Sequence, residues 1–319
     1  MDDLLALGGA GIAVGDATRE PGAWPGLIQV GVDREGVLPA GPSQRFDILI
    51  TTRPSPPRPW VFVEAARLEA SLDHLKACVA AQPAASAVLG QVLRMTLRLD
   101  LDQALALESL AYSMLLASSG FRAWRAGRPR RRREEGAERV NLAKADGVLR
   151  IELSRPDARN AFDAAMRDAL VEALEFALED PDALPVELVG AGPGFSSGGD
   201  LDEFGDAPDP AEAHLVRTLQ SPARLVAALG PRLTARLHGA CIGAGIEVPA
   251  AAARITARPG ATFRLPEVSM GLIPGAGGTA TVPRRIGRER ACYMALSGAE
   301  IDLDTALAWG LVDVAEPNP

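Results

Sequence analysis

The stretch His238–Thr279, HGACIGAGIEVPAAAARITARPGATFRLPEVSMGLIPGAGGT, decides the fold of this chain of 319 residues. It places a glycine-rich turn just before Glu247, a second carboxylate at Glu267 after a proline, and a Gly-Ala-Gly-Gly turn at its end. Glycines let the backbone approach a ligand closely, and two carboxylates suit acid/base chemistry on a polarised carbonyl compound. The stretch therefore indicates an enzyme site in which Glu247 and Glu267 transfer protons.

Each carboxylate, taken alone, has a purely structural alternative. Glu247 precedes an Ala-rich segment, Val248–Arg254, that predicts a buried helix, so burial would disfavour its ionised form and suit proton transfer near neutral pH. The alternative is a solvent-facing glutamate favoured by the helix dipole. For Glu267 the alternative is a surface residue paired with Arg264.

A second glycine-rich turn, Gly194–Asp200 (GFSSGGD), lies upstream. Its small residues would let a ligand lie against backbone N–H groups, and a helix starting near Asp200 would add its N-terminal dipole. Such donors can stabilise a developing oxyanion. Alone, the turn is more typical of close packing, as is Gly243–Glu247.

Together, these segments resemble the crotonase (enoyl-CoA hydratase/isomerase) superfamily, with matching positions in family order from Val140 to about Val314. Further matches are Arg155–Phe162 (RPDARNAF), Pro283–Gly287 (PRRIG), Leu296–Gly298 (LSG) and Ala306–Asp313 (ALAWGLVD). The resemblance implies an α/β fold, a crotonase-like ββα spiral core with an additional helical assembly region. It also implies an acyl-CoA thioester ligand.

The resemblance implies a role for each site residue. Glu247 and Glu267 match the two catalytic glutamates, and the backbone N–H groups of Ser197 and Ala244 match the oxyanion hole. The expected substrate-binding residues are Arg155, Ala158, Ser197, Gly198, Gly199, Asp200 and Gly243. Neither a metal nor a separate cofactor is expected, because coenzyme A is part of the substrate.

Three regions are expected along the chain. Residues 1–60 form an N-terminal extension of unassigned role, with short strands at Gly11–Val14, Leu27–Val32 and Phe46–Thr51. Residues 61–138 contain helices and an Arg-rich connector. Residues 139–319 form the crotonase core, where strands and helices alternate.

Hydrophobic periodicity predicts individual elements in the last two regions. Leu68, Leu72, Leu75 and Val79 recur at helical spacing, and Asp100 or Asp102 could cap a later helix. The elements expected in the core are strands at Val148–Leu153, Val186–Val189 and Arg232–Leu237, and helices at Ala164–Glu179 and Asp302–Trp309.

The segment Leu68–Arg128 resembles the helices that normally close the crotonase fold after its core. We therefore hypothesise a circularly permuted crotonase, which is physically permissible because the termini of compact domains often lie close together. The alternative is an unrelated helical domain rich in Ala and Leu. A structure in which Leu68–Arg125 packs away from the core would contradict the permutation.

The run Arg128–Glu138 (RPRRRREEGAE) would then connect the helices to the core. Arg125, Arg128 and the cluster from Arg130 to Arg133 could contact the phosphates of coenzyme A, because guanidinium groups suit phosphate recognition. A solvated linker is the alternative for this charge run.

Composition narrows the remaining possibilities. A net charge of −8 gives no reason to expect nucleic acid. Cys78, Cys241 and Cys292 are widely spaced, which indicates reduced thiols rather than disulfides. No signal peptide or membrane-spanning stretch is evident. A cytoplasmic protein is therefore expected. The resemblance implies a homotrimer or homohexamer.

The function expected from these residues is reversible hydration of a 2-enoyl-CoA thioester to a 3-hydroxyacyl-CoA. Another crotonase-type reaction of an acyl-CoA is the first alternative: a double-bond isomerase, a thioester hydrolase or a decarboxylase. A non-catalytic acyl-CoA-binding subunit is the second, motivated by residues 1–60.

Overall fold

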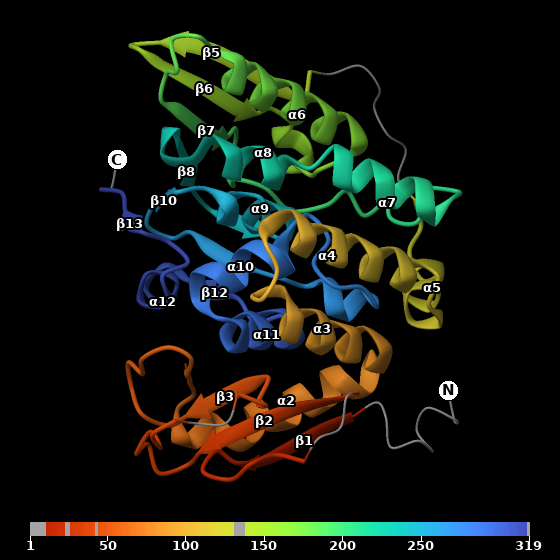
Figure 1. The fold of residues 1–319 in the computed structure, drawn as a ribbon, viewed down its shortest axis with the longest axis vertical. Helices are drawn as coiled ribbons and strands as arrows, with labels where there is room; N and C mark the ends of the chain where they lie inside the picture. The colour runs from red at the N-terminus through yellow and green to blue at the C-terminus, as the bar shows by residue number, and fades with distance from the viewer. Residues whose placement is uncertain (1–10, 23–25, 42–43, 131–137, 318–319) are drawn as a thin grey trace.

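A computed structural model describes residues 11–22, 26–41, 44–130 and 138–317 (Figure 1). It begins with a four-stranded parallel sheet whose strands pair in chain order, β1-β2-β3-β4. The strands are β1 Gly11–Asp16, β2 Leu27–Asp33, β3 Ile48–Thr51 and β4 Val61–Phe62. The three strands predicted in this region are confirmed, and β4 is a fourth that the periodicity did not indicate.

Four α-helices follow the sheet. They are α2 Leu68–Ala81, α3 Pro83–Thr96, α4 Leu101–Leu116 and α5 Ser119–Ala126, preceded by the 3-10 turn η1 Ala65–Arg67. Asp100 is the cap of α4: its carboxylate accepts from the Gln103 N–H, and the Gln103 side chain accepts in return from the Asp100 N–H. In the described part of the chain no single helix is long and apolar enough to cross a membrane; only α4 and α5 together, bent by 63°, meet that test.

The core of the molecule is a six-stranded sheet in the order β13-β10-β8-β7-β6-β5, beside a three-stranded sheet in the order β12-β11-β9. Strands β5 and β6 form an antiparallel hairpin, and the other neighbours in the large sheet are parallel. The large sheet comprises β5 Val140–Ala145, β6 Val148–Leu153, β7 Val186–Gly190, β8 Leu233–Leu237, β10 Arg254–Ala257 and β13 Val314–Ala315. The small sheet comprises β9 Ala240–Ile242, β11 Thr262–Arg264 and β12 Ile301–Asp302.

Helices and 3-10 turns alternate with these strands. The helices are α6 Ala164–Glu179, α7 Pro210–Leu219, α8 Pro222–Leu229, α9 Ala244–Glu247, α10 Gly278–Ile286, α11 Arg288–Ser297 and α12 Leu303–Trp309. The 3-10 turns are η2 Pro156–Ala158, η3 Gly230–Arg232, η4 Pro249–Ala251 and η5 Glu267–Met270. The predicted bounds of β6 and α6 are confirmed without change, and Asp302 caps α12 through the Thr305 N–H at 2.8 Å.

The N-terminal helices lie between the N-terminal sheet and the core (Figure 1). Helices α3 and α4 contact α10, while α2, α3 and strand β3 contact α11. One continuous hydrophobic cluster runs from Ile28 in β2 to Val312 near the C-terminal end of the described chain. The segment Leu68–Arg125 therefore packs on the core, as a circular permutation requires.

Two predicted helices of the core are absent from its described residues. The Ala-rich segment Val248–Arg254 forms only the turn η4 before β10 begins, because Pro249 has no N–H to continue the hydrogen bonding of α9. The segment after Asp200 is a series of turns rather than a helix. Glu247 is consequently the last residue of a four-residue helix.

Candidate active site

Glu247 is buried at the end of α9, with 2% of its surface exposed. Its Oε2 atom accepts from the backbone N–H groups of Ala276 at 2.7 Å and Gly278 at 2.9 Å, in the turn that leads into α10. Burial raises the pKa of Glu247 to about 7, although these backbone donors oppose the shift. The carboxylate therefore changes charge near neutral pH, and the solvent-facing alternative is wrong.

Glu267 begins the turn η5 directly after Pro266 and is also buried. Its Oε2 atom is buried and has no hydrogen-bond partner among the described residues. Burial, followed by the nearby charge of Glu247, raises the pKa of Glu267 well above its ordinary value. Arg264 donates to the carbonyl of Gly298 instead, so the alternative of a surface ion pair is wrong.

The two carboxylates face one point beside Gly243. A Cβ atom placed on Gly243 would lie 2.5 Å from Oε1 of Glu267 and 3.7 Å from Oε1 of Glu247. Gly243 also has a φ of 52°, which L side chains rarely adopt. Its lack of a side chain leaves the space in which both carboxylates can reach the same small group.

The two turns expected to form an oxyanion hole lie side by side. Ile242 donates its N–H to the carbonyl of Ser196 at 2.9 Å, and a Cβ on Gly198 would lie 2.7 Å from the carbonyl oxygen of Ile242. Ala244 is the first residue of α9, and its N–H has no acceptor among the described residues. It can therefore donate to a ligand.

The other expected donor, Ser197, is engaged within the protein. Its N–H donates to the carbonyl of Arg159 at 2.9 Å. Arg159 and Asn160 both have positive φ angles, of 54° and 52°, so this loop holds its carbonyl in an unusual direction. A thioester oxygen at Ser197 would have to share or replace this bond.

A third buried carboxylate, which the sequence analysis missed, comes from the N-terminal helices. Glu108 of α4 accepts from the Gly277 N–H at 2.6 Å, the Thr279 N–H at 2.6 Å and the Thr279 hydroxyl at 2.7 Å. Burial, and then the charge of Glu247, raise the pKa of Glu108 to about 8. Glu108 and Glu247 thus bind alternate N–H groups of one turn, between residues 276 and 279.

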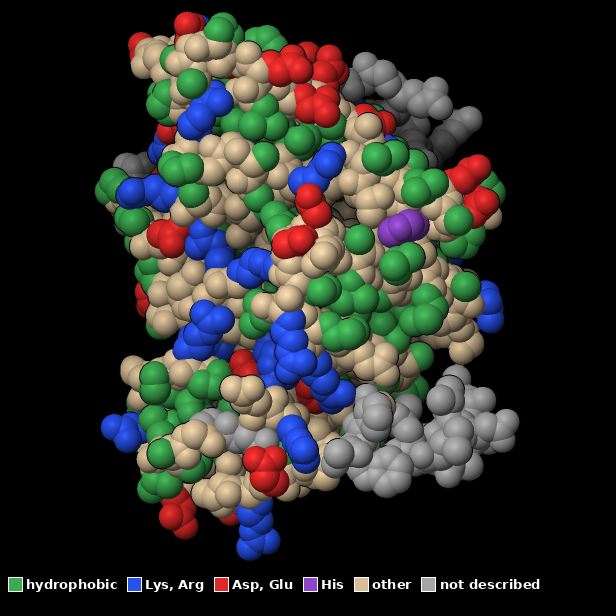
Figure 2. All heavy atoms as spheres, in the orientation of Figure 1, with side chains coloured by type: hydrophobic (Ala, Val, Ile, Leu, Met, Phe, Trp, Pro, Cys, Tyr) green, Lys and Arg blue, Asp and Glu red, His purple; other side chains and the backbone are tan. Residues whose placement is uncertain are grey.

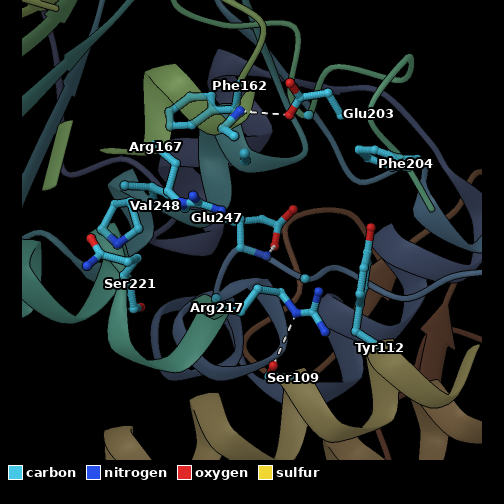
Figure 3. A pocket seen from close by; sticks show the side chains of 18 of the residues that line it. Ser109, Tyr112, Phe162, Arg167, Glu203, Phe204, Arg217, Ser221, Glu247 and Val248 are labelled. Carbon is cyan, nitrogen blue, oxygen red and sulfur yellow. Dashed lines mark hydrogen bonds between the residues drawn. The ribbon is translucent and has the colours of Figure 1, made fainter. Parts of the chain in front are cut away.

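A cavity of about 250 Å³ opens beside the two predicted catalytic glutamates (Figure 3). Glu247, Glu267 and Ala244 line it on the core side. Apolar residues from α4 and from the core cover other parts of its wall: Leu105, Tyr112, Leu116, Phe162 and Phe204. The volume and lining suit a small acyl group held next to the carboxylates.

A larger groove of about 920 Å³ brings together most of the predicted substrate-binding residues. Its lining includes Arg155, Ala158, Ser197, Gly199 and Asp200 from the core, with Arg125 and Arg128 from the end of the N-terminal helices. Gly198 and Gly243 do not line this groove; they lie at the contact between the two turns.

The arginines of the groove differ in their partners. Arg155 is tied to Asp200 at 2.8 Å, so it shapes the loop and has limited freedom to bind a ligand. Arg128 lies with its guanidinium carbon 4.8 Å from the centre of the Trp124 ring, where it stays accessible. Arg130 pairs with Asp206, and the predicted cluster members Arg131, Arg132 and Arg133 lie outside the described residues.

Residues 143–318 match the family model described as enoyl-CoA hydratase/isomerase. The chain belongs to this family. The 2,3-dehydroadipyl-CoA hydratase of Escherichia coli (strain K12) is 36% identical over 182 residues, which are 56% of this chain and 69% of that protein. The cyclohexa-1,5-dienecarbonyl-CoA hydratase of Thauera aromatica is 34% identical over 181 residues, 57% of this chain and 68% of that protein.

Solved structures agree with this assignment to the enoyl-CoA hydratase/isomerase family. The enoyl-CoA hydratase from Thermoplasma volcanium GSS1 has a TM-score of 0.52 at 31% identity, covering 56% of this chain and 72% of that chain. DspI from Pseudomonas aeruginosa has a TM-score of 0.53 at 27% identity, covering 58% and 71%. The expected crotonase superfamily and α/β fold are confirmed, and the chain is a hydratase-like enzyme of crotonase-type acyl-CoA chemistry.

Proposed function

We propose that the enzyme catalyses the reversible hydration of a 2-enoyl-CoA thioester to a 3-hydroxyacyl-CoA. The observation that carries this proposal is the pair of buried carboxylates that face one point beside Gly243. Hydration needs two groups, one to take a proton from water and one to give a proton to carbon. Several relatives are themselves named hydratases, which supports the same reaction here.

The two carboxylates have different environments, and these suit different roles. Glu247 accepts two backbone hydrogen bonds that favour its ionised form, so it is assigned as the base. Glu267 has a buried oxygen without a partner, and the pKa of its carboxyl group is raised well above the ordinary value, so it is assigned as the acid. A raised pKa keeps a carboxylic acid protonated until it is needed.

In the proposed step, Glu247 takes a proton from water as the water oxygen bonds to C3 of the thioester. The electron pair of the C2–C3 double bond shifts towards the thioester carbonyl, whose oxygen becomes an enolate stabilised by the N–H groups of Ala244 and Ser197. Glu267 then gives its proton to C2, and the carbonyl re-forms. A proton passing from Glu247 to Glu267 restores both groups, and no separate cofactor takes part.

The groove lined by Arg125 and Arg128 supports a position for coenzyme A, with its phosphates towards these two side chains. Guanidinium groups bind phosphate through paired hydrogen bonds. The thioester end would then pass Ser197 and Gly199 to reach the glutamates. Replacing both arginines with glutamine should weaken binding of an acyl-CoA most strongly at low salt, where the charge attraction is least screened.

The test of the reaction is a panel of 2-enoyl-CoA thioesters, followed by loss of the conjugated thioester absorbance and product analysis by mass spectrometry. Glu247→Gln and Glu267→Gln should each lower kcat by about a hundredfold or more and leave thioester binding largely intact. A product of unchanged mass would instead support double-bond isomerisation. Full activity in both variants would overturn the assignment of the two residues.

We further propose that the chain is a circularly permuted crotonase, in which Leu68–Arg128 takes the place of the closing helices. The packing of α3 and α4 on α10, and the delivery of Glu108 to the site by α4, support this reading. The relatives also have about 30% of their length outside the matched part, since 69% of one and 72% of another are covered.

A superposition that ignores chain order tests the permutation. It should lay α2 to α5 on the helices that close the fold of the solved relatives, in the same sequence. Helices that superpose elsewhere, or on nothing, would contradict it. The homotrimer or homohexamer and the cytoplasmic location remain predictions from family resemblance, and sedimentation analysis of the purified chain checks the first of them.

A further inference from the structure

The acyl cavity contains two arginines whose charge the hydration step does not use. Arg217 on α7 and Arg167 on α6 both line the cavity that holds Glu247 and Glu267 (Figure 3). An apolar acyl chain has no use for a guanidinium group, and placing one against methylene groups carries a desolvation penalty. Their presence needs an explanation in terms of a ligand or of the fold.

Arg217 has no carboxylate partner. Its Nε atom donates to the Ser109 hydroxyl at 3.1 Å, a second guanidinium nitrogen donates to Ser113, and the guanidinium carbon lies 5.0 Å from the centre of the Tyr112 ring. Within the described residues it forms no ion pair. Burial lowers the pKa of Arg217; Tyr112 and the charge of Glu108 oppose this shift, and the charge of Arg167 adds to it.

Of the acidic side chains in the cavity lining, Glu267 serves the proposed reaction, and four others have partners elsewhere. Glu108 accepts three hydrogen bonds from the turn before α10, and Glu247 accepts two. Asp163 and Asp200 pair with Arg139 and Arg155. The partly buried guanidinium of Arg217, which no carboxylate of the described residues contacts directly, therefore faces the space that the acyl group would occupy.

We propose that the far end of the substrate's acyl chain carries a carboxylate, which Arg217 binds as the counterion that the fold does not supply. This inference rests on the proposed function, because it takes the cavity as the acyl site. Arg167 reinforces the subsite: its one carboxylate partner, among the described residues, is the exposed neighbour Asp168. Ser221 and Gln220 lie in the same lining and supply further polar groups.

The subsite defines a substrate class, the mono-CoA thioesters of 2-unsaturated dicarboxylic acids. One end of such a substrate is the thioester near Ala244, and the other is the carboxylate at Arg217. A planar guanidinium can bind both oxygens of a carboxylate. A hydrogen bond to a charged group in such a site typically changes affinity by about ten- to a hundredfold.

Binding of unreactive thioesters tests the subsite separately from the reaction. Saturated mono-CoA thioesters of dicarboxylic acids with about four to eight carbons are compared with monocarboxylic thioesters of equal length, by calorimetry on the full chain. We expect one dicarboxylic length to bind about tenfold or more tightly than its neutral counterpart. Equal binding at every length would overturn the inference, whatever the chain does to enoyl thioesters.

Variants of Arg217 distinguish a ligand contact from a structural link between α7 and α4. Arg217→Gln should abolish the preference, so that the dicarboxylic and monocarboxylic thioesters bind with about equal affinity. Arg217→Lys should keep part of the preference, because the positive charge remains although the planar guanidinium is lost. Loss of binding to both thioesters by the same factor would mean that Arg217 only joins the two helices. Thermal unfolding of both variants shows whether each one still folds.

Arg224→Gln on α8 is the matched control. Arg224 follows the lining residues Ser221 and Pro222 in the sequence but does not itself line the cavity. Its side chain donates to the carbonyl of Leu219. Its removal deletes one positive charge from the same part of the molecule and should leave the preference unchanged. A preference reduced equally in Arg224→Gln and Arg217→Gln would point to general charge and overturn the assigned contact. Failure to hydrate any enoyl thioester, with the binding preference retained, would contradict the reaction and leave the subsite standing.

Discussion

Gly243 lies at the head of α9 with both reactive carboxylates turned towards it. We expect Gly243→Ala to reduce kcat by about a hundredfold, because its Cβ would lie 2.5 Å from Oε1 of Glu267 and would push that carboxylate away. The measurement is steady-state hydration of a 2-enoyl-CoA. Gly260→Ala is the control, since Gly260 also has a positive φ, of 80°, but open space where its Cβ would stand. Equal losses in the two variants would mean that backbone strain, not displacement of Glu267, is responsible.

The pH dependence of the reaction follows from the same two residues. The pKa of Glu247 is raised to about 7, so activity should fall as the pH drops below that value and the base becomes protonated. The pKa of Glu267 is also raised well above its ordinary value, mainly by burial, and activity should fall at high pH, when this acid loses its proton. A profile of kcat/KM against pH checks this. A rate that stays constant from pH 5 to pH 9 would contradict both assignments.

At the scale of elements, α4 supports the turn that holds Glu247. We expect Glu108→Gln to lower kcat with little change in KM, because an amide cannot accept all three hydrogen bonds from Gly277 and Thr279. Removing its charge should also move the alkaline limb of the pH profile to lower pH, since Glu108 helps to raise the pKa of Glu267. Asp102→Asn, an exposed acidic residue of the same helix, is the control. A loss of kcat without any shift of the pH profile would mean that Glu108 only supports the turn and does not raise the pKa of Glu267.

The raised pKa of Glu108 has a consequence for stability as well as for catalysis. Its folded pKa is about 8, above the ordinary 4.5, so the folded chain binds the proton more tightly than the unfolded chain. The free energy of unfolding should therefore decrease as the pH rises from about 4.5 to about 8. Urea unfolding at a series of pH values measures this slope, and Glu108→Gln should make it shallower. An equal slope in the variant would show that other groups dominate.

Local patterns in the sequence predicted the regular elements well, and the site only in part. The helix Ala164–Glu179 and the strand Val148–Leu153 follow from hydrophobic spacing, which acts within one element. Val248–Arg254 fails as a helix because the missing N–H of Pro249 outweighs the alanines around it. Glu108 could not be found in this way, because its partners are backbone N–H groups 169 and 171 residues away and leave no pattern of their own.

At the scale of the whole molecule, charged side chains join the N-terminal sheet to the helices packed against it. Asp47, directly before β3, is buried and accepts a hydrogen bond from Arg94 of α3 at 2.6 Å, and Arg288 of α11 lies 3.7 Å from it. Figure 2 shows several Lys or Arg side chains gathered where the N-terminal sheet meets the rest of the molecule. Arg290 of α11 donates to the carbonyl of Trp60 at 3.0 Å. The N-terminal sheet is therefore fastened to the family core as well as packed against it.

Asp47→Asn should lower the free energy of unfolding by about 2 kcal/mol, because it leaves a partly buried arginine without its charged acceptor. Chemical denaturation measures this loss. Asp73→Asn, which breaks an exposed pair with Lys76, should change stability by less than about 1 kcal/mol. Comparable losses in both variants would mean that the sheet is not held through Asp47.

The contact between Glu108 and the turn at Gly277 also determines when the site can form during synthesis. The helices of the N-terminal half leave the ribosome first. They can pack on β1, β2 and one another, but the faces that contact α10 and α11 have no partner until these two helices follow. Such long-range contacts slow folding and prolong the exposure of apolar surface. The enzyme should therefore become active only after nearly all of its chain has been made, and its early translation products should be prone to aggregation.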